Sequence, residues 1–310
     1  MSFATFRTYA IHSVLFLLTF FTTTLAGVQW LNQDVFDLSN FVNGLPYSLS
    51  LLAVLASHEF GHYFAAKHHQ IDVTLPYFIP IPPFIANPFG TMGAVIRIRS
   101  PLTRRSVLFD VGIAGPIAGL VVTLGIFLFG LTHLPPKDFL YTIHPEFKLL
   151  SELPEGGFSL GKSLMFNGLL QLADGRDFIP PMSEIYHYPY LCVGWFGMFV
   201  TALNLIPVGQ LDGGHILYAL TGPRVQGLAA RIFFGILILI GIVSMIPISG
   251  LNVQLGTTGW LLWAAILYFL VKLDHPEVID PEPLTQGRIY LGWGTMLLFI
   301  LMFPPVPFFV

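Results

Sequence analysis

The sequence has little charge and almost no cysteine. Only 10% of its 310 residues are charged, 54% are hydrophobic, and the mean hydropathy is +0.73. Soluble globular domains carry about 25% charged residues, so this composition favours a polytopic membrane protein. The net charge of −3 gives no electrostatic basis for binding nucleic acid. A single cysteine, Cys192, excludes an intramolecular disulfide framework and a cysteine-based structural zinc site.

Long windows without charge locate the expected membrane spans. A helix needs roughly 20 apolar residues to cross the hydrocarbon core. Suitable windows lie between residues 7 and 34, 37 and 59, 110 and 137, 184 and 212, and 231 and 272, and after residue 288. The window 231–272 is long enough for two helices, with 247–259 as the turn between them. We therefore expect an all-α protein with about seven transmembrane helices, forming a single membrane domain over residues 1–310.

The distribution of positive charge predicts an orientation. With the N-terminus in the cytoplasm, 10 of the 14 Lys and Arg residues fall in cytoplasmic loops and 4 fall outside. This asymmetry agrees with the positive-inside rule and places the C-terminus outside. The four outside residues lie in one long segment, 132–187, which has no clear hydrophobic period. We interpret that segment as an extramembrane insertion.

The apolar segment 75–100 does not have the pattern of a helix. It contains five prolines, which prevent a regular helix. Its end, 91–98, is rich in β-branched residues, follows Gly90 and contains Gly93, which predicts a short hairpin or strand. Irregular backbone at membrane depth must be buried in protein or line a wet cavity. We expect a membrane-dipping β-hairpin here; the alternative is a surface loop packed on helix ends.

The second expected span carries the pattern H-E-x-x-H at residues 58–62. On a helix, positions i and i+4 share one face, so the imidazoles of His58 and His62 can reach one metal ion. Glu59 can reach a water on that metal without being a ligand. Random placement would give this pattern roughly 0.007 times in such a chain. The alternative is that these polar groups only mark the interfacial end of the helix.

A tetrahedral zinc site needs a third protein ligand. The best candidate is Asp212, which follows the helix-stopping Pro207 and Gly209 at the end of the fourth expected span. In the predicted topology the second and fourth spans both end at the cytoplasmic face, so the two segments arrive on the same side. The alternative is that Asp212 is the N-cap of a helix over 213–220. His215, just beyond, would orient Asp212 or cap at the interface.

Together, HExxH in one span and NLIPVGQLDGG in a later one resemble the site-2 protease family of intramembrane zinc metalloproteases, and the second segment is similar to its cyanobacterial and plastid branch. The resemblance covers about 51–220, which we take as the catalytic core. It implies that His58, His62 and Asp212 bind Zn²⁺, that Glu59 is the catalytic base, and that Asn204 steadies the substrate or the oxyanion. Gly209 departs from the family pattern, in which a second proline is common.

By this resemblance the protein is expected to be a zinc metalloendopeptidase that cuts a transmembrane helix of another protein within the lipid bilayer. The hairpin residues Gly90, Gly93 and Val95 would position the unwound substrate by β-addition. The expected location is the bacterial cytoplasmic membrane or a plastid membrane, with the active-site face cytoplasmic. Alternatives are a transporter or permease with a His/Asp ion site, an inactive helix-binding scaffold, and a prenyl-protein type of HExxH protease.

Overall fold

The computed structural model describes residues 3–84, 88–150, 153–154, 157–173, 178–246, 256–280 and 282–309. The chain divides into two compact units. The first comprises residues 1–100, 118–155 and 173–197, and the second comprises 101–117, 156–172 and 198–310. Helices α3 (Arg105–Thr132) and α6 (Pro189–Asn204) contribute residues to both units.

The first unit is built on two long helices and a β-hairpin. Its elements, besides parts of α3 and α6, are α1 (Phe3–Trp30), η1 (Leu38–Gly44), α2 (Leu45–His68), β1 (Tyr77–Pro80), β2 (Thr91–Val95), α4 (Asp138–Ile143), η2 (Pro145–Leu149), η3 (Gln171–Ala173, shared with the second unit) and η4 (Ile185–His187). Helix α2 starts with a proline in its first turn and ends with Lys67 and His68, which suit the dipole of a helix C-terminus.

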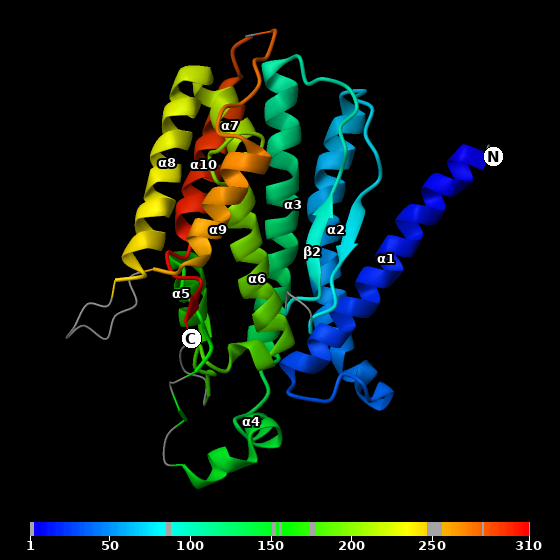
Figure 1. The fold of residues 1–310 in the computed structure, drawn as a ribbon, viewed down its shortest axis with the longest axis vertical. Helices are drawn as coiled ribbons and strands as arrows, with labels where there is room; N and C mark the ends of the chain where they lie inside the picture. The colour runs from blue at the N-terminus through cyan, green and yellow to red at the C-terminus, as the bar shows by residue number, and fades with distance from the viewer. Residues whose placement is uncertain are drawn as a thin grey trace. The chain divides into compact units, whose positions relative to one another are not determined.

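The proline-rich segment forms the predicted hairpin. Strands β1 and β2 are antiparallel, with Tyr77 opposite Val95 and Phe78 opposite Ala94. Figure 1 shows β2 beside α2. The hairpin is tied to α1 by two hydrogen bonds: His12 Nδ1 lies 2.9 Å from the Pro76 carbonyl, and Thr22 Oγ1 donates to the Gly90 carbonyl at 2.7 Å. The non-helical backbone is therefore packed against protein, as an apolar environment requires.

The second unit contains a helical hairpin and several shorter elements. Its elements, besides parts of α3 and α6, are β3 (Ser159–Leu160), α5 (Leu164–Leu170), α7 (Asp212–Thr221), α8 (Pro223–Val243), α9 (Gly259–Ile266), the π-helical turn η5 (Leu267–Val271), α10 (Gln286–Met302) and β4 (Phe308–Phe309). Strand β3 pairs with β4, so the start of α5 is fastened to the end of the chain. Asp110 of α3 and Arg288 of α10 form a bidentate ion pair, with both N–O distances 2.7 Å.

Helices occupy every charge-free window, but not all of them are long. Within the described residues, four helices are long and apolar enough to cross a membrane, over Arg7–Trp30, Leu38–His68, Arg105–Thr132 and Pro223–Val243. Helices α6, α9 and α10 have 16, 8 and 17 residues. These are shorter than the roughly 20 residues of a regular span. The predominantly helical fold is confirmed, whereas the count of seven spans is not, and the turn predicted over 247–259 lies mostly outside the described residues.

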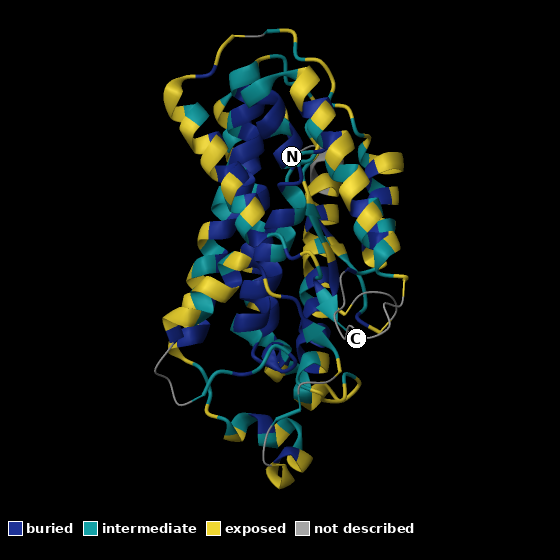
Figure 2. Ribbon diagram, turned by 90° about the vertical axis from the view of Figure 1, so that its left-hand side faces the viewer, coloured by how far each residue is buried: buried dark blue, intermediate teal, exposed yellow. Residues whose placement is uncertain are grey.

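The long helices expose apolar side chains in continuous stripes. On α8 the exposed residues follow a spacing of three and four: Val225, Leu228, Ile232, Ile236, Leu239 and Ile242. Figure 2 shows exposed residues running along the helices beside buried ones. Contiguous apolar surface of this extent is unusual on soluble monomers. It is the surface that a lipid-facing helix presents.

Candidate metal centre

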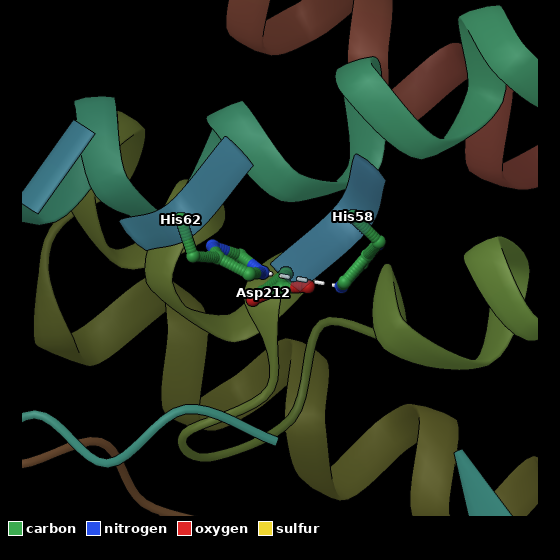
Figure 3. Close-up of side chains that lie close together, drawn as sticks. All are labelled: His58, His62 and Asp212. Carbon is green, nitrogen blue, oxygen red and sulfur yellow. Dashed lines mark hydrogen bonds between the residues drawn. The ribbon is translucent and has the colours of Figure 1, made fainter. Parts of the chain in front are cut away.

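His58 and His62 lie one turn apart on the same face of α2. Both side chains are buried, and their Nε2 atoms are 3.1 Å apart. The two rings stand nearly at right angles, with an interplanar angle of 78°. Figure 3 shows both imidazoles projecting from α2 toward one point. The pairing predicted from the i, i+4 spacing is therefore present within a single helix.

Close packing of α3 supports His58. A Cβ atom placed on Gly119 would lie 3.1 Å from His58 Cβ and 3.3 Å from its Nδ1. A larger residue at this position would therefore crowd the imidazole. Small residues let neighbouring helices approach closely, and at Gly119 the neighbour is His58.

Glu59 follows His58 on α2 and is also buried, with 7% of its surface exposed. The helix around it is apolar, with Leu51, Leu52, Val54 and Leu55 among its buried residues. An acidic side chain in such a span is costly, by roughly 2.5–3.5 kcal/mol on insertion scales for a charged residue at the centre. A nearby cation offsets this cost, which agrees with a metal bound by the flanking histidines.

Asp212 is the first residue of α7, and the turn before it is tightly constrained. Gly209 has a φ of +51°, and the Lys272 carbonyl occupies the space that a Cβ would need. A proline at this position, as in other family members, would not fit this turn, since its φ is fixed near −65°. The N-cap is Leu211, with no side-chain hydrogen bond. The alternative prediction that Asp212 caps this helix is therefore wrong.

The two histidines of α2 can be compared with the geometry that a metal ion requires. Tetrahedral zinc with bonds of 2.0–2.2 Å separates its ligand atoms by about 3.3–3.6 Å. The 3.1 Å between the two Nε2 atoms is close to that separation. Imidazole nitrogens are also donors that zinc accepts, so these residues fit the metal.

The other predicted site residues lie at the end of α6 and in or just before β2. Asn204 is the last residue of α6, just before the turn that leads to Asp212. Gly90 precedes β2 and is held at its carbonyl by Thr22. Gly93 and Val95 lie in β2 itself, and Val95 is 51% exposed.

His275 is a neighbour of His215 that the sequence did not indicate. Its Nε2 lies 2.7 Å from His215 Nδ1, and its own Nδ1 lies 2.6 Å from the Pro276 carbonyl. Because a carbonyl only accepts, His275 carries its proton on Nδ1 and accepts from His215. Burial lowers the pKa of His275, which keeps this ring neutral. The two histidines are 60 positions apart, so their proximity could not be predicted from the sequence.

Helix α2 is apolar and long enough to cross a membrane, and it carries a buried histidine pair with an intervening acid. These features are typical of a membrane metallopeptidase. The comparison with protein families agrees. The chain belongs to peptidase family M50, whose family model matches residues 46–248. This is the family of site-2 proteases, so the resemblance drawn from the two sequence patterns is confirmed.

Two similar proteins come from plants. The chain is 27% identical over 303 residues to "Probable zinc metalloprotease EGY2, chloroplastic" of Oryza sativa subsp. indica, covering 94% of this chain and 49% of the relative. It is 31% identical over 200 residues to "Probable zinc metalloprotease EGY1, chloroplastic" of Arabidopsis thaliana, covering 64% and 34%. The chain thus spans about half of the length of EGY2 and about a third of the length of EGY1. No solved structure matches the chain significantly.

Proposed function

We propose that this protein is an intramembrane zinc metalloprotease that hydrolyses peptide bonds in or near transmembrane helices of other membrane proteins. The observation that carries the proposal is the buried pair of His58 and His62 on α2, whose Nε2 atoms are 3.1 Å apart, with the buried acid Glu59 between them in sequence. Membership of family M50 and the printed names of the relatives support the same chemistry. The whole chain acts as one membrane domain, with the catalytic core at 51–220 and an extramembrane insertion at 132–187.

His58, His62 and Asp212 would hold Zn²⁺ in a three-ligand site that leaves a fourth position open. When bound, the zinc supplies Lewis acidity that makes water a nucleophile near neutral pH. Glu59 accepts the proton of the attacking water and later gives it to the departing amine. Asn204 donates a hydrogen bond to the oxygen of the scissile carbonyl as negative charge develops there.

The substrate must unwind before it is cut, because an intact helix hides its carbonyls in internal hydrogen bonds. A cleft of about 480 Å³ lies beside the middle of α2 and is lined mainly by apolar residues of α1, α2 and the start of β1: Phe16, Leu17, Ala56, Phe60, Pro76 and Phe78. Its lining suits an apolar segment entering from lipid. Strand β2, with Met92 and Val95 more than half exposed, would pair with the unwound segment by β-addition.

Proline at Val95 tests the role of β2, because proline removes a backbone donor from the strand. We expect Val95→Pro to reduce cleavage of a single-span substrate, with expression and zinc content unchanged. Val95→Thr, which keeps the strand donor, is the matched control. Unchanged cleavage by a normally expressed Val95→Pro protein would remove β-addition from the mechanism.

The proposed location is the bacterial cytoplasmic membrane or a plastid membrane, with the N-terminus and the active-site face cytoplasmic. The relatives carry "chloroplastic" in their names, and the apolar stripes on the long helices support an integral membrane position. Cysteine accessibility at engineered loop positions, for example in 132–187 against 69–74, tests the orientation.

The alternative function, a transporter with a His/Asp ion site, is not favoured by the family match. The experiment that decides uses the purified full chain in detergent, a model single-span substrate and a Glu59→Gln variant. A protease loses turnover while it retains zinc. Ion-coupled flux in proteoliposomes without any peptide hydrolysis would support the transporter instead.

A further inference from the structure

A second cluster of metal-ligating side chains lies in the first unit, outside the site described above. His144 follows α4, whereas Glu184 and His187 lie in and just before η4, ahead of α6. One ligand atom of each lies within 4.8 Å of the other two. The residues of this cluster come from segments 43 residues apart, and neither segment contributes to α2.

The separations fit a single tetrahedral ion. The two Nε2 atoms are 3.0 Å apart, Glu184 Oε2 lies 3.4 Å from His187 Nε2, and it lies 3.8 Å from His144 Nε2. Zinc bonds of 2.0–2.2 Å at tetrahedral angles place ligand atoms about 3.3–3.6 Å apart. The three distances scatter around that value, so one ion could contact all three atoms after small shifts.

The remaining ring nitrogens already have the partners that metal-binding histidines use. His187 Nδ1 donates to the backbone carbonyl of Trp30, the last residue of α1. His144 Nδ1 lies 3.2 Å from the Glu146 carboxylate. Outer hydrogen bonds of this kind, to a carbonyl or a carboxylate, fix the tautomer and leave Nε2 free to bind the metal.

The hydrogen bonds of the two Nδ1 atoms leave electron-rich atoms facing one another, and a cation would offset their repulsion. With a proton on each Nδ1, both Nε2 atoms present lone pairs to each other at 3.0 Å. Glu184 is 95% buried, and its Oε2 has no hydrogen-bond partner among the described residues. Two lone pairs and a buried carboxylate oxygen facing one another repel unless positive charge lies between them.

We propose that His144, Glu184 and His187 bind a zinc-type divalent cation, separate from the catalytic centre, which fastens the insertion to the end of α1. Two imidazoles and one carboxylate are a donor set typical of zinc. Burial lowers the pKa of His187 to about 4 and raises the pKa of Glu184. Bound metal would offset the burial of these groups and, through His187, tie both segments to Trp30. The rival is a proton: an imidazolium at His144 would also satisfy Glu146, Glu184 and His187.

Metal counting on the full chain distinguishes these possibilities. In a His58→Ala/His62→Ala background, which removes the catalytic pair, we expect one tightly bound zinc per chain and, after exchange, the visible absorption of tetrahedral Co²⁺. Adding His144→Gln should remove both signals. Adding His133→Gln, a change at an exposed histidine in the same segment, should leave both signals intact.

Thermal unfolding provides a second readout, in case a variant folds poorly. Zinc should raise the Tm of the His58→Ala/His62→Ala protein, and this increase should be absent in the triple variant with His144→Gln. A folded His58→Ala/His62→Ala protein that holds no zinc or cobalt and shows no zinc-dependent Tm would overturn the proposal and favour the imidazolium. Because the catalytic histidines are absent throughout, this result is independent of the proposed protease activity.

Discussion

The two histidine clusters achieve similar geometry by different means. On α2, His58 and His62 are four residues apart, and the helix itself sets their Nε2 atoms 3.1 Å apart. In the second cluster, His144 and His187 are 43 positions apart, and their Nε2 atoms lie 3.0 Å apart. The Glu146 carboxylate orients His144 and the Trp30 carbonyl orients His187. The first arrangement is rigid as soon as α2 forms. The second exists only when distant segments are folded together, so metal binding and local folding should be coupled there.

The largest effect is expected at Glu59, the residue that distinguishes a catalytic cluster from a purely structural one. Glu59→Gln keeps the shape of the side chain but removes the base, so cleavage should fall by about 10²–10⁴-fold while zinc content stays unchanged. Hydrolysis of a single-span substrate and zinc per chain are the two measurements. Glu277→Gln, at an exposed acid, is the control. Full activity in Glu59→Gln would remove this residue from the mechanism.

A smaller loss should follow from disturbing the packing behind His58. Gly119→Val would push on His58, because even a Cβ would lie 3.1 Å from His58 Cβ. Displacing a catalytic group by about 1 Å costs on the order of 10²-fold in rate, and zinc should bind more weakly. Gly125→Val is the matched control on the same helix, since nothing lies within 4 Å of its Cβ position. Equal kcat/KM values for the two variants would show that this contact does not position His58.

Metal binding by the second cluster should depend on Glu146, which orients His144. Removing such an outer partner typically costs 10–100-fold in metal affinity. Glu146→Gln should therefore weaken zinc at the second site by about tenfold or more, without changing the catalytic rate. Competition with a chromogenic chelator in the His58→Ala/His62→Ala background measures this affinity. Unchanged affinity would show that His144 is not oriented through this carboxylate.

A change outside both clusters gives the scale of a purely structural effect. Arg288 forms its ion pair with Asp110 in a partly exposed position, with side chains 32% and 24% exposed. Arg288→Ala should lower the free energy of unfolding by about 1 kcal/mol, with zinc content unchanged. Arg288→Lys should recover part of this loss, because lysine keeps the charge but not the bidentate geometry. Denaturation in detergent measures both values, and a loss of zinc in either variant would contradict this interpretation.

Local regularity decided which features could be predicted from the sequence. The His58–His62 pairing follows from helix geometry alone, and the hairpin at 77–95 follows from proline content and β-branched residues. The number of spans was harder to predict, because a charge-free window gives only an upper limit on helix length. Helix α6 has 16 residues, from Pro189 to Asn204, and α9 has 8 before the π-helical turn.

Contacts between distant segments left no local signal. The second cluster forms only when His144, Glu184 and His187 come together from distant parts of the insertion. The insertion has no hydrophobic period, so no spacing rule could predict this cluster. The fit of Gly209 against the Lys272 carbonyl likewise depends on residues 63 positions apart in sequence. In the sequence, Gly209 was only a departure from the family pattern. The structure explains why glycine is at this position, because its φ is +51°.

The most direct test of the central proposal is zinc per chain, measured together with cleavage, for Asp212→Ala and Asp138→Ala in a His144→Gln background. That background removes the proposed second site, so the count reports the catalytic centre alone. We predict that Asp138→Ala, which changes an exposed acid, keeps one zinc and full cleavage, while Asp212→Ala loses both. An Asp212→Ala protein that retains one tightly bound zinc and cuts the substrate at the same rate would contradict the account.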